Sequence, residues 1–199
     1  MRVLRLVSFS VIVALLVAAC GSGTAAPTAV TSEAASAATT TEFTDEWGVV
    51  KVEAGDPIRV GFGAALSGAG VDLLGIDEKR GAELAIADKG DILGFSVELV
   101  AEDDLCSAEG GTTVANKFIS DPSIVAVLGQ MCSSGCLAAM DIYQEHGYTM
   151  VSPSCTAVVL TTRGNSAFNR VCWNDAIQAP AGAQFLYGRG ITKAATIHD

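Results

Sequence analysis

The chain has 199 residues, half of them hydrophobic, and its 22 acidic and 12 basic side chains give a formal net charge of −10. Such an acidic excess repels phosphate groups, which argues against a nucleic-acid-binding protein and against electrostatic docking on anionic lipid. Attachment to a membrane would therefore need a lipid.

Residues 1–20 have the three parts of an export signal. Arg2 and Arg5 form a short positive region, an apolar stretch follows, and two alanines precede Cys20. The apolar stretch is too short to span a bilayer, so we interpret it as a cleaved signal peptide. Residues 16–20 also resemble the bacterial lipobox, which implies that Cys20 carries a lipid and becomes the new N-terminus. An ordinary signal peptide with an incidental cysteine is the alternative.

Residues 21–46 consist mostly of Ala, Thr, Ser and Gly, with almost no large apolar side chains. Such a segment buries too little surface to offset the entropy lost on ordering. We therefore predict a disordered tether that lifts a domain off the membrane.

Strand and helix signals alternate from Gly48 onward. We expect strands over 57–65, 95–101, 124–128, 149–152, 168–172 and 193–198, and helices over 77–88, 108–120, 134–146 and 176–187. Regular alternation predicts an α/β fold in which helices cover both faces of a doubly wound parallel sheet. Ligands bind such sheets at the carboxyl ends of the strands, where the winding reverses. This rule selects the loops after residue 65, at Asp103, at 129–134 and at 152–156, none of which contains Lys, Arg or His.

Hydroxyl side chains gather in three of these loops. Ser67 lies in the first loop, Ser133 and Ser134 in the third, and Ser154 and Thr156 in the fourth. The third-loop serines are good N-caps for the following helix, and the fourth-loop pair could simply serve a turn. A helix N-terminus with free N–H groups and a hydroxyl is also what binds a carboxylate. We therefore expect ligand contacts at these loops.

Patterns typical of enzymes and metal sites are incomplete. Gly61-x-Gly63 lies inside a strand, and Leu66 stands where a dinucleotide loop needs its third glycine. Met131 stands where a nucleophile elbow around Ser133 needs a glycine. The four-residue spacing of Cys132 and Cys136 has no second pair at zinc-site spacing. We expect no catalytic residue, no cofactor and no metal.

Five cysteines follow Cys20 in the exported part. Disulfides are the default use of cysteine outside the cytoplasm, and five cysteines allow at most two bridges. Sequence alone does not choose among the possible pairings of Cys106, Cys132, Cys136, Cys155 and Cys172.

Several ordered segments together resemble one known family. They are residues 58–61, 66–68, 80–85, 103–106, 114–117, 132–134, 142–143, 152–157, 160–161 and 197–199. Over residues 57–199 the chain resembles the branched-chain amino-acid binding proteins, which are receptors of ABC importers with the type I periplasmic-binding fold. The resemblance implies two lobes that close on a ligand and deliver it to a permease.

The same resemblance implies roles for individual residues. The positions that would grip the ligand's α-carboxylate and amine are Ser133, Ser154, Cys155 and Thr156. Leu74 stands where relatives often place an aromatic ring over the ligand, and Cys106 with Cys132 matches a disulfide pair. For the second bridge we expect Cys155–Cys172, which would leave Cys136 free.

The implied organisation is a lipoprotein signal (1–20), a tether (21–46), ligand-binding lobe one (47–175) and the beginning of lobe two (176–199). Family chains continue well past Asp199, so we expect a fragment or a truncated gene product. The implied function is that of an exported, lipid-anchored solute-binding protein for amino acids or a related small polar solute. The alternative is the ligand-sensing domain of a receptor or of an amide-responsive regulator with the same fold.

Overall fold

The computed structural model describes residues 44–45, 48–68 and 70–195. The predicted signal peptide, Cys20 and nearly all of the predicted tether lie outside these residues. Within the described part, no helix has the length and apolar character needed to cross a membrane. The elements that position the candidate site all belong to one compact unit, Glu42–Asp199.

Five parallel strands form a single sheet with the order β2-β1-β3-β4-β5. They are β1 Ile58–Ala64, β2 Val97–Asp103, β3 Ile124–Gly129, β4 Met150–Ser152 and β5 Phe168–Arg170. The chain winds from β1 outward to β2 and then returns past β1 to β3. The winding therefore reverses between β1 and β3, and this confirms the predicted doubly wound α/β class.

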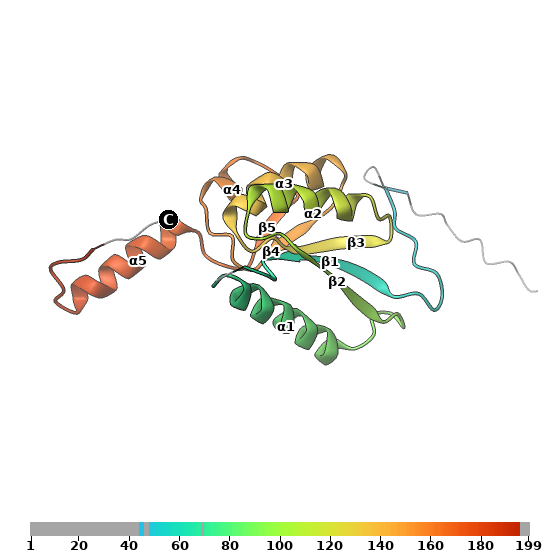
Figure 1. The fold of residues 1–199 in the computed structure, drawn as a ribbon, viewed down its shortest axis with the longest axis horizontal. Coiled ribbons are helices and arrows are strands. Elements are labelled where there is room, and N and C mark those ends of the chain that lie inside the picture. The colour runs from blue at the N-terminus through green and yellow to red at the C-terminus, as the bar shows by residue number, and fades with distance from the viewer. Residues whose placement is uncertain (1–43, 46–47, 69, 196–199) are drawn as a thin grey trace, which may run out of the picture. The chain divides into compact units, whose positions relative to one another are not determined.

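Helices cover both faces of the sheet (Figure 1). The helices are α1 Asp72–Lys89, α2 Ala108–Ile119, α3 Ser133–Glu145, α4 Val159–Thr162 and α5 Asp175–Gly188. Helix α1 lies on one face, and α2 and α3 lie side by side on the other. Buried side chains of α2 and α3, such as Phe118 and Tyr143, pack with Ile124, Val127 and Met150 from β3 and β4. The continuous apolar run of β3 is explained by this burial.

Three helix or strand predictions differ from the structure. Helix α1 begins at Asp72 rather than at 77, because Gly75 and the exposed Leu73 and Leu74 interrupt the apolar periodicity of its first turns. Helix α4 was not predicted, since four residues are too few to show a period. Residues 193–195 form no strand, and the remainder of the strand predicted there lies outside the described residues.

Two disulfides are formed among the residues that the structure describes. Cys106 is bonded to Cys132, with Cα atoms 5.2 Å apart, and Cys136 is bonded to Cys155, with Cα atoms 6.6 Å apart. The expected Cys155–Cys172 bridge is therefore wrong, and Cys172 is a free thiol. The loop after β4 lies over the first turn of α3, where Cys136 is buried in the core, and this arrangement favours the bond between Cys155 and Cys136.

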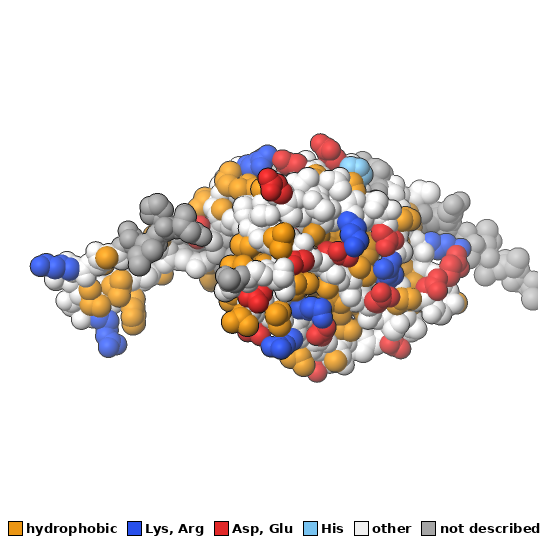
Figure 2. Space-filling model, in the orientation of Figure 1, with side chains coloured by type: hydrophobic (Ala, Val, Ile, Leu, Met, Phe, Trp, Pro, Cys, Tyr) orange, Lys and Arg blue, Asp and Glu red, His pale blue; other side chains and the backbone are white. Residues whose placement is uncertain are grey.

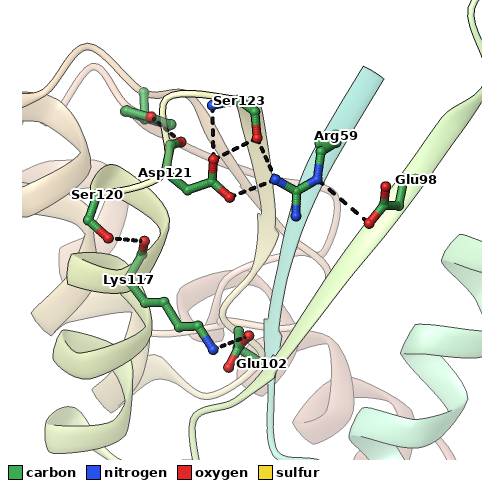
Figure 3. Close-up of polar contacts among 8 residues, drawn as sticks. Arg59, Glu98, Glu102, Lys117, Ser120, Asp121 and Ser123 are labelled. Carbon is green, nitrogen blue, oxygen red and sulfur yellow. Dashed lines mark hydrogen bonds and ion pairs between the residues drawn. The ribbon is translucent and has the colours of Figure 1, made fainter. Parts of the chain in front are cut away.

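An ion-pair network stabilises the amino edge of the sheet, where the parallel strands begin (Figure 3). Arg59, near the start of β1, donates from Nη1 to the Asp121 carboxylate over 2.6 Å and also to the Ser123 hydroxyl. Its Nε atom lies 3.6 Å from Glu98 on β2. Ser123 also donates to Asp121 from its backbone N–H and its hydroxyl, over 3.0 and 2.6 Å. Asp121 thus joins the turn before β3 to β1.

We expect Asp121→Ala to lower the free energy of unfolding by about 1–2 kcal/mol, because several donors lose their acceptor at once. The exposed pair of Asp77 with Arg80 provides a control, and Asp77→Ala should cost no more than about 0.5 kcal/mol. Hydrogen bonds from Ser123 and Arg59 lower the pKa of Asp121. Its contribution should be complete above the unfolded aspartate pKa of about 3.9 and disappear as pH falls through the lower folded value. Urea unfolding measured against pH tests both expectations, and equal losses in the two variants would contradict them.

Removing the first bridge with Cys106→Ser and Cys132→Ser together should lower the free energy of unfolding by about 3–4 kcal/mol in the chain-entropy model, because the bridge closes a loop between residues 26 positions apart. Cys172→Ser is the matched control, since it leaves both bridges intact and should change stability by less than about 0.5 kcal/mol. Denaturant unfolding provides the measurement. Non-reducing peptide mapping that found Cys132 joined to Cys136 would refute the pairing.

Candidate functional site

The first turn of α1 and the loops after β1, β3 and β4 meet at the carboxyl edge of the sheet. Gly75 in that first turn is buried, and a Cβ atom there would lie 1.9 Å from the Ala65 carbonyl oxygen and 3.2 Å from the Met131 sulfur. Only glycine permits this close approach. Leu74, the neighbouring candidate residue, is 59% exposed. The helix start is thus held against the end of β1 while Leu74 remains open to solvent.

Hydrogen bonds join the loops after β3 and β4 in register. Ser152 Oγ donates to the Gln130 carbonyl over 2.6 Å, Ser154 Oγ donates to the Met131 carbonyl over 2.8 Å, and the Ala157 N–H donates to Ser133 Oγ over 3.1 Å. The two loops therefore form one rigid platform at adjacent strand ends.

The serine hydroxyls at the start of α3 do not cap the helix. Cys132 occupies the N-cap position and makes no side-chain capping bond, so the expected N-cap role of Ser133 and Ser134 is wrong. Ser133 Oγ accepts from Ala157, and Ser134 Oγ donates to the Cys106 carbonyl over 3.2 Å. The first N–H groups of an α-helix have no partner within the helix. The N-terminus of α3 therefore offers donors beside the platform.

Cys155 and Thr156 differ in how many of their polar groups remain available to a ligand. The side chain of Cys155 is bonded in the second disulfide and fully buried, so only its backbone can meet a ligand. Its carbonyl accepts from Arg170 Nη1 over 3.0 Å. The Thr156 carbonyl accepts from the Asp175 N–H over 3.0 Å. Among the described residues, the Thr156 hydroxyl has no hydrogen-bond partner, so it remains available to a ligand.

Ser67, the candidate from the loop after β1, is engaged with the neighbouring strand end. Its hydroxyl donates to Asp103 over 2.5 Å, and the Leu66 and Leu105 N–H groups donate to the same carboxylate over 2.9 and 3.0 Å. Burial opposes ionisation of Asp103, but these hydrogen bonds outweigh it and lower the pKa. Asp103 therefore stays charged and fixes the first loop to the second.

Three polar residues beneath the platform were not predicted from the sequence. Asp104 and Gln130 are fully buried, and Glu78 on α1 is half-buried. Burial raises the pKa of Asp104, and the charge of Asp103 adds to the rise, whereas the hydrogen bond from the Cys106 N–H lowers the pKa. Burial likewise raises the pKa of Glu78, and the Asp104 charge raises it further. A polar residue directly after an apolar strand, as at Gln130, was the available sequence signal.

The arrangement combines neutral donors with acidic groups and lacks cationic side chains in the four loops. A carboxylate would have to be held by N–H and hydroxyl groups at the start of α3 and at Thr156. A cationic amine would be favoured by nearby carbonyls and by acidic residues such as Asp103. In the described part of the chain, no group of three or more His, Cys, Asp or Glu side chains is arranged to hold a metal ion. The site therefore suits a small solute with both charges.

The surface shown in Figure 2 carries acidic and basic side chains interspersed with hydrophobic ones. Neither sign forms a continuous track over the helices on this face. The charge pattern on this face is thus unlike the basic stripe that a nucleic acid requires.

Comparison with known proteins agrees with the fold described above. The model of a family described as periplasmic binding protein matches residues 57–199. The Leu/Ile/Val-binding protein of Escherichia coli is 36% identical over 148 residues, which cover 72% of this chain and 40% of that protein. The chain spans about 40% of the length of the curated relatives that it matches.

Two solved structures are also similar. A leucine-binding protein of Thermotoga maritima has a TM-score of 0.61 and 28% identity, covering 66% of this chain and 37% of that one. An ABC transporter substrate-binding protein of Desulfitobacterium hafniense, solved in complex with Leu, has a TM-score of 0.60 and 29% identity, covering 68% and 40%. The family match over most of the chain, together with this sheet order, shows that the chain belongs to the periplasmic binding protein family.

Proposed function

We propose that this protein is the solute-binding component of an ABC importer and that its ligand is an amino acid with an apolar side chain. The observation that carries the proposal is the platform of two loops with neutral donors at the carboxyl edge of the sheet, next to the point between β1 and β3 where the winding reverses. The similar proteins are named as binding leucine, isoleucine and valine, or as components of ABC transporters. These names support an importer over a sensory domain, and we therefore do not carry the sensory alternative further.

The ligand's α-carboxylate would lie at the N-terminus of α3. Helix N–H groups carry partial positive charge, so they stabilise an anion without a lysine or arginine. Thr156 would add its free hydroxyl, whereas Ser133 would share its oxygen between the ligand and the Ala157 N–H. Ser154 is committed to Met131, and its role would be to hold the loop.

The ligand's amine and side chain would lie toward Cys155 and α1. Cys155 would line the site through its backbone, although its carbonyl already accepts from Arg170 Nη1. Leu74, exposed at the first turn of α1, would contact an apolar ligand side chain. An aliphatic residue here provides surface without the flat face of an aromatic ring, which suits branched aliphatic ligands.

Residues 47–175 would form lobe one, and residues 176–199 would begin lobe two. Helix α5 supports this division, because none of its residues is buried and Ile177, Phe185 and Tyr187 are more than half exposed. An apolar helix of this kind requires a further packing partner. Closure of the second lobe over the ligand would then complete the site, and the loaded protein would present the solute to a permease. No bond-breaking step is proposed.

We further propose that the protein is exported and held at the membrane by a lipid on Cys20. Mass spectrometry of membrane fractions should find a mature N-terminus at Cys20 that carries acyl chains, and Cys20→Ser should release the protein from the membrane. A soluble mature protein that starts at any other residue would refute the lipid anchor without affecting the ligand proposal.

Ser133→Ala and Thr156→Ala should each weaken amino-acid binding by about 1.5–3 kcal/mol, because a charge-assisted hydrogen bond is left unmade. This corresponds to about a ten- to hundredfold rise in Kd. Calorimetry against a panel of amino acids, on a chain that continues into the second lobe, gives the measurement. The 199-residue chain should bind the same solute far more weakly, because half of the burial is absent.

Ser120→Ala is the matched control for these variants. The Ser120 hydroxyl donates to the Lys117 carbonyl over 2.7 Å at the amino edge of the sheet, away from the candidate site (Figure 3). Its Kd should equal that of the unchanged protein. Because Ser133 also accepts from Ala157, the unfolding free energy of each variant must be measured alongside its Kd. If neither site substitution changes Kd, the ligand binds elsewhere. Tight binding by the 199-residue chain alone would lead to the same conclusion.

A further inference from the structure

Three cysteines lie in or next to the loop that follows β4. Cys136 on α3 and Cys155 after β4 are joined as a disulfide, and neither side chain is exposed. Cys172, after β5, is a free thiol and is partly exposed. Because β4 and β5 are neighbouring parallel strands, their carboxyl ends place Cys155 and Cys172 side by side.

Contacts on both sides hold Cys172 near the disulfide. Its sulfur lies 3.6 Å from the carbonyl oxygen of Cys155, and Arg170 Nη1 donates to that same oxygen over 3.0 Å. Beyond Cys172, the Asp175 N–H donates to the Thr156 carbonyl over 3.0 Å. The chain is therefore fixed against residues 155 and 156 before and after the thiol, and the thiol stays close to one end of a disulfide.

We propose that Cys172 exchanges with the Cys136–Cys155 disulfide, so that the protein interconverts between two internal pairings. The Cys172 thiol gives up its proton and its sulfur attacks the sulfur of Cys155. The Cys155–Cys172 bond forms as the Cys136–Cys155 bond breaks. The electron pair leaves on the Cys136 sulfur, which takes up one proton. Disulfide number is conserved, and the step requires no oxidant or reductant.

The structure also provides a place for the released thiol. The Cys136 sulfur lies 3.2 Å from the Gln130 carbonyl oxygen, so a Cys136 thiol can donate a hydrogen bond there without moving. The Ser152 hydroxyl already donates to that carbonyl over 2.6 Å, and the oxygen has a second lone pair for the thiol. Exchange thus moves the free thiol from a partly exposed position to a buried one.

The two pairings connect different parts of the molecule. The Cys136–Cys155 bond ties the loop after β4 to α3, whereas a Cys155–Cys172 bond ties it to the segment that leads from β5 into α5. Exchange therefore changes what restrains the loop at 153–157. This device rests on the contact of the Cys172 sulfur with the Cys155 carbonyl and on the neighbouring strands β4 and β5, and it does not depend on the identity of the ligand.

Trypsin separates the two states by mass. Cys106 lies in peptide 90–117, the cysteines 132, 136 and 155 lie together in peptide 118–163, and Cys172 lies in peptide 171–189. The pairing in the structure gives a two-peptide species and a separate peptide 171–189 with a free thiol. The exchanged pairing gives a three-peptide species. Its free thiol lies at Cys136, and cyanogen bromide cleavage at Met140 and Met150 separates this cysteine from Cys155.

The protein is held at pH 8 without reductant, quenched in acid, unfolded in denaturant, and then alkylated with N-ethylmaleimide and digested below pH 7. We expect both species, with alkylated Cys136 appearing in the same fraction as the three-peptide species. Tenfold dilution before the quench should not change that fraction, because the exchange is internal. Recovery of peptide 171–189 only as the alkylated single peptide would overturn the proposal.

Two variants complete the test. Cys172→Ser should abolish the three-peptide species and leave none of Cys106, Cys132, Cys136 and Cys155 open to alkylation. Cys136→Ser leaves Cys155 and Cys172 as two thiols, and mild air oxidation should join them and yield the three-peptide species in full. If Cys136→Ser keeps both thiols after oxidation while its circular dichroism remains native, the two sulfurs do not meet and the proposal fails.

Discussion

The hydrogen bonds between the loops after β3 and β4 are the contact on which the candidate site depends. Ser152, Ser154 and Ala157 each bond to a residue of the loop at 130–133, so two segments that would otherwise move separately behave as one. The donors that a ligand would use lie on this unit. Their directions are set before any ligand arrives, and little conformational entropy is left to lose on binding.

The absence of basic side chains from the four loops gives the site its chemical character. A lysine or arginine would attract any anion, including phosphate, whereas N–H groups at a helix terminus favour a small carboxylate at short range. The acidic residues at the same edge add a penalty for ligands that carry only negative charge. Discrimination would thus come from repulsion of such anions as much as from attraction of a zwitterion.

Much of the fold followed from the sequence, because the strands and α2 have a clear hydrophobic pattern and clear turn or capping residues at their ends. The run at 124–128 predicted a buried central strand. The four loops chosen by the winding rule lie at the carboxyl ends of the strands, and those after β1 and β3 flank the switch point. The first turn of α1 was missed because Gly75 looks like a helix breaker until its contact with Ala65 is seen. Side-chain partners were the least predictable. Ser133 looked like a helix cap, and only the position of Ala157 reveals its bond.

The placement of the cysteines divides the sheet into two regions of different stability. All four bonded cysteines lie at or next to the carboxyl edge, whereas the amino edge depends on Arg59 and Asp121. A reducing environment therefore loosens one edge and leaves the other intact, so that opening is local rather than global. Amide hydrogens of the loops after β3 and β4 would then exchange with solvent while those at the start of β1 stay protected. The carboxyl edge of the sheet therefore reaches its full stability only in a compartment that oxidises thiols.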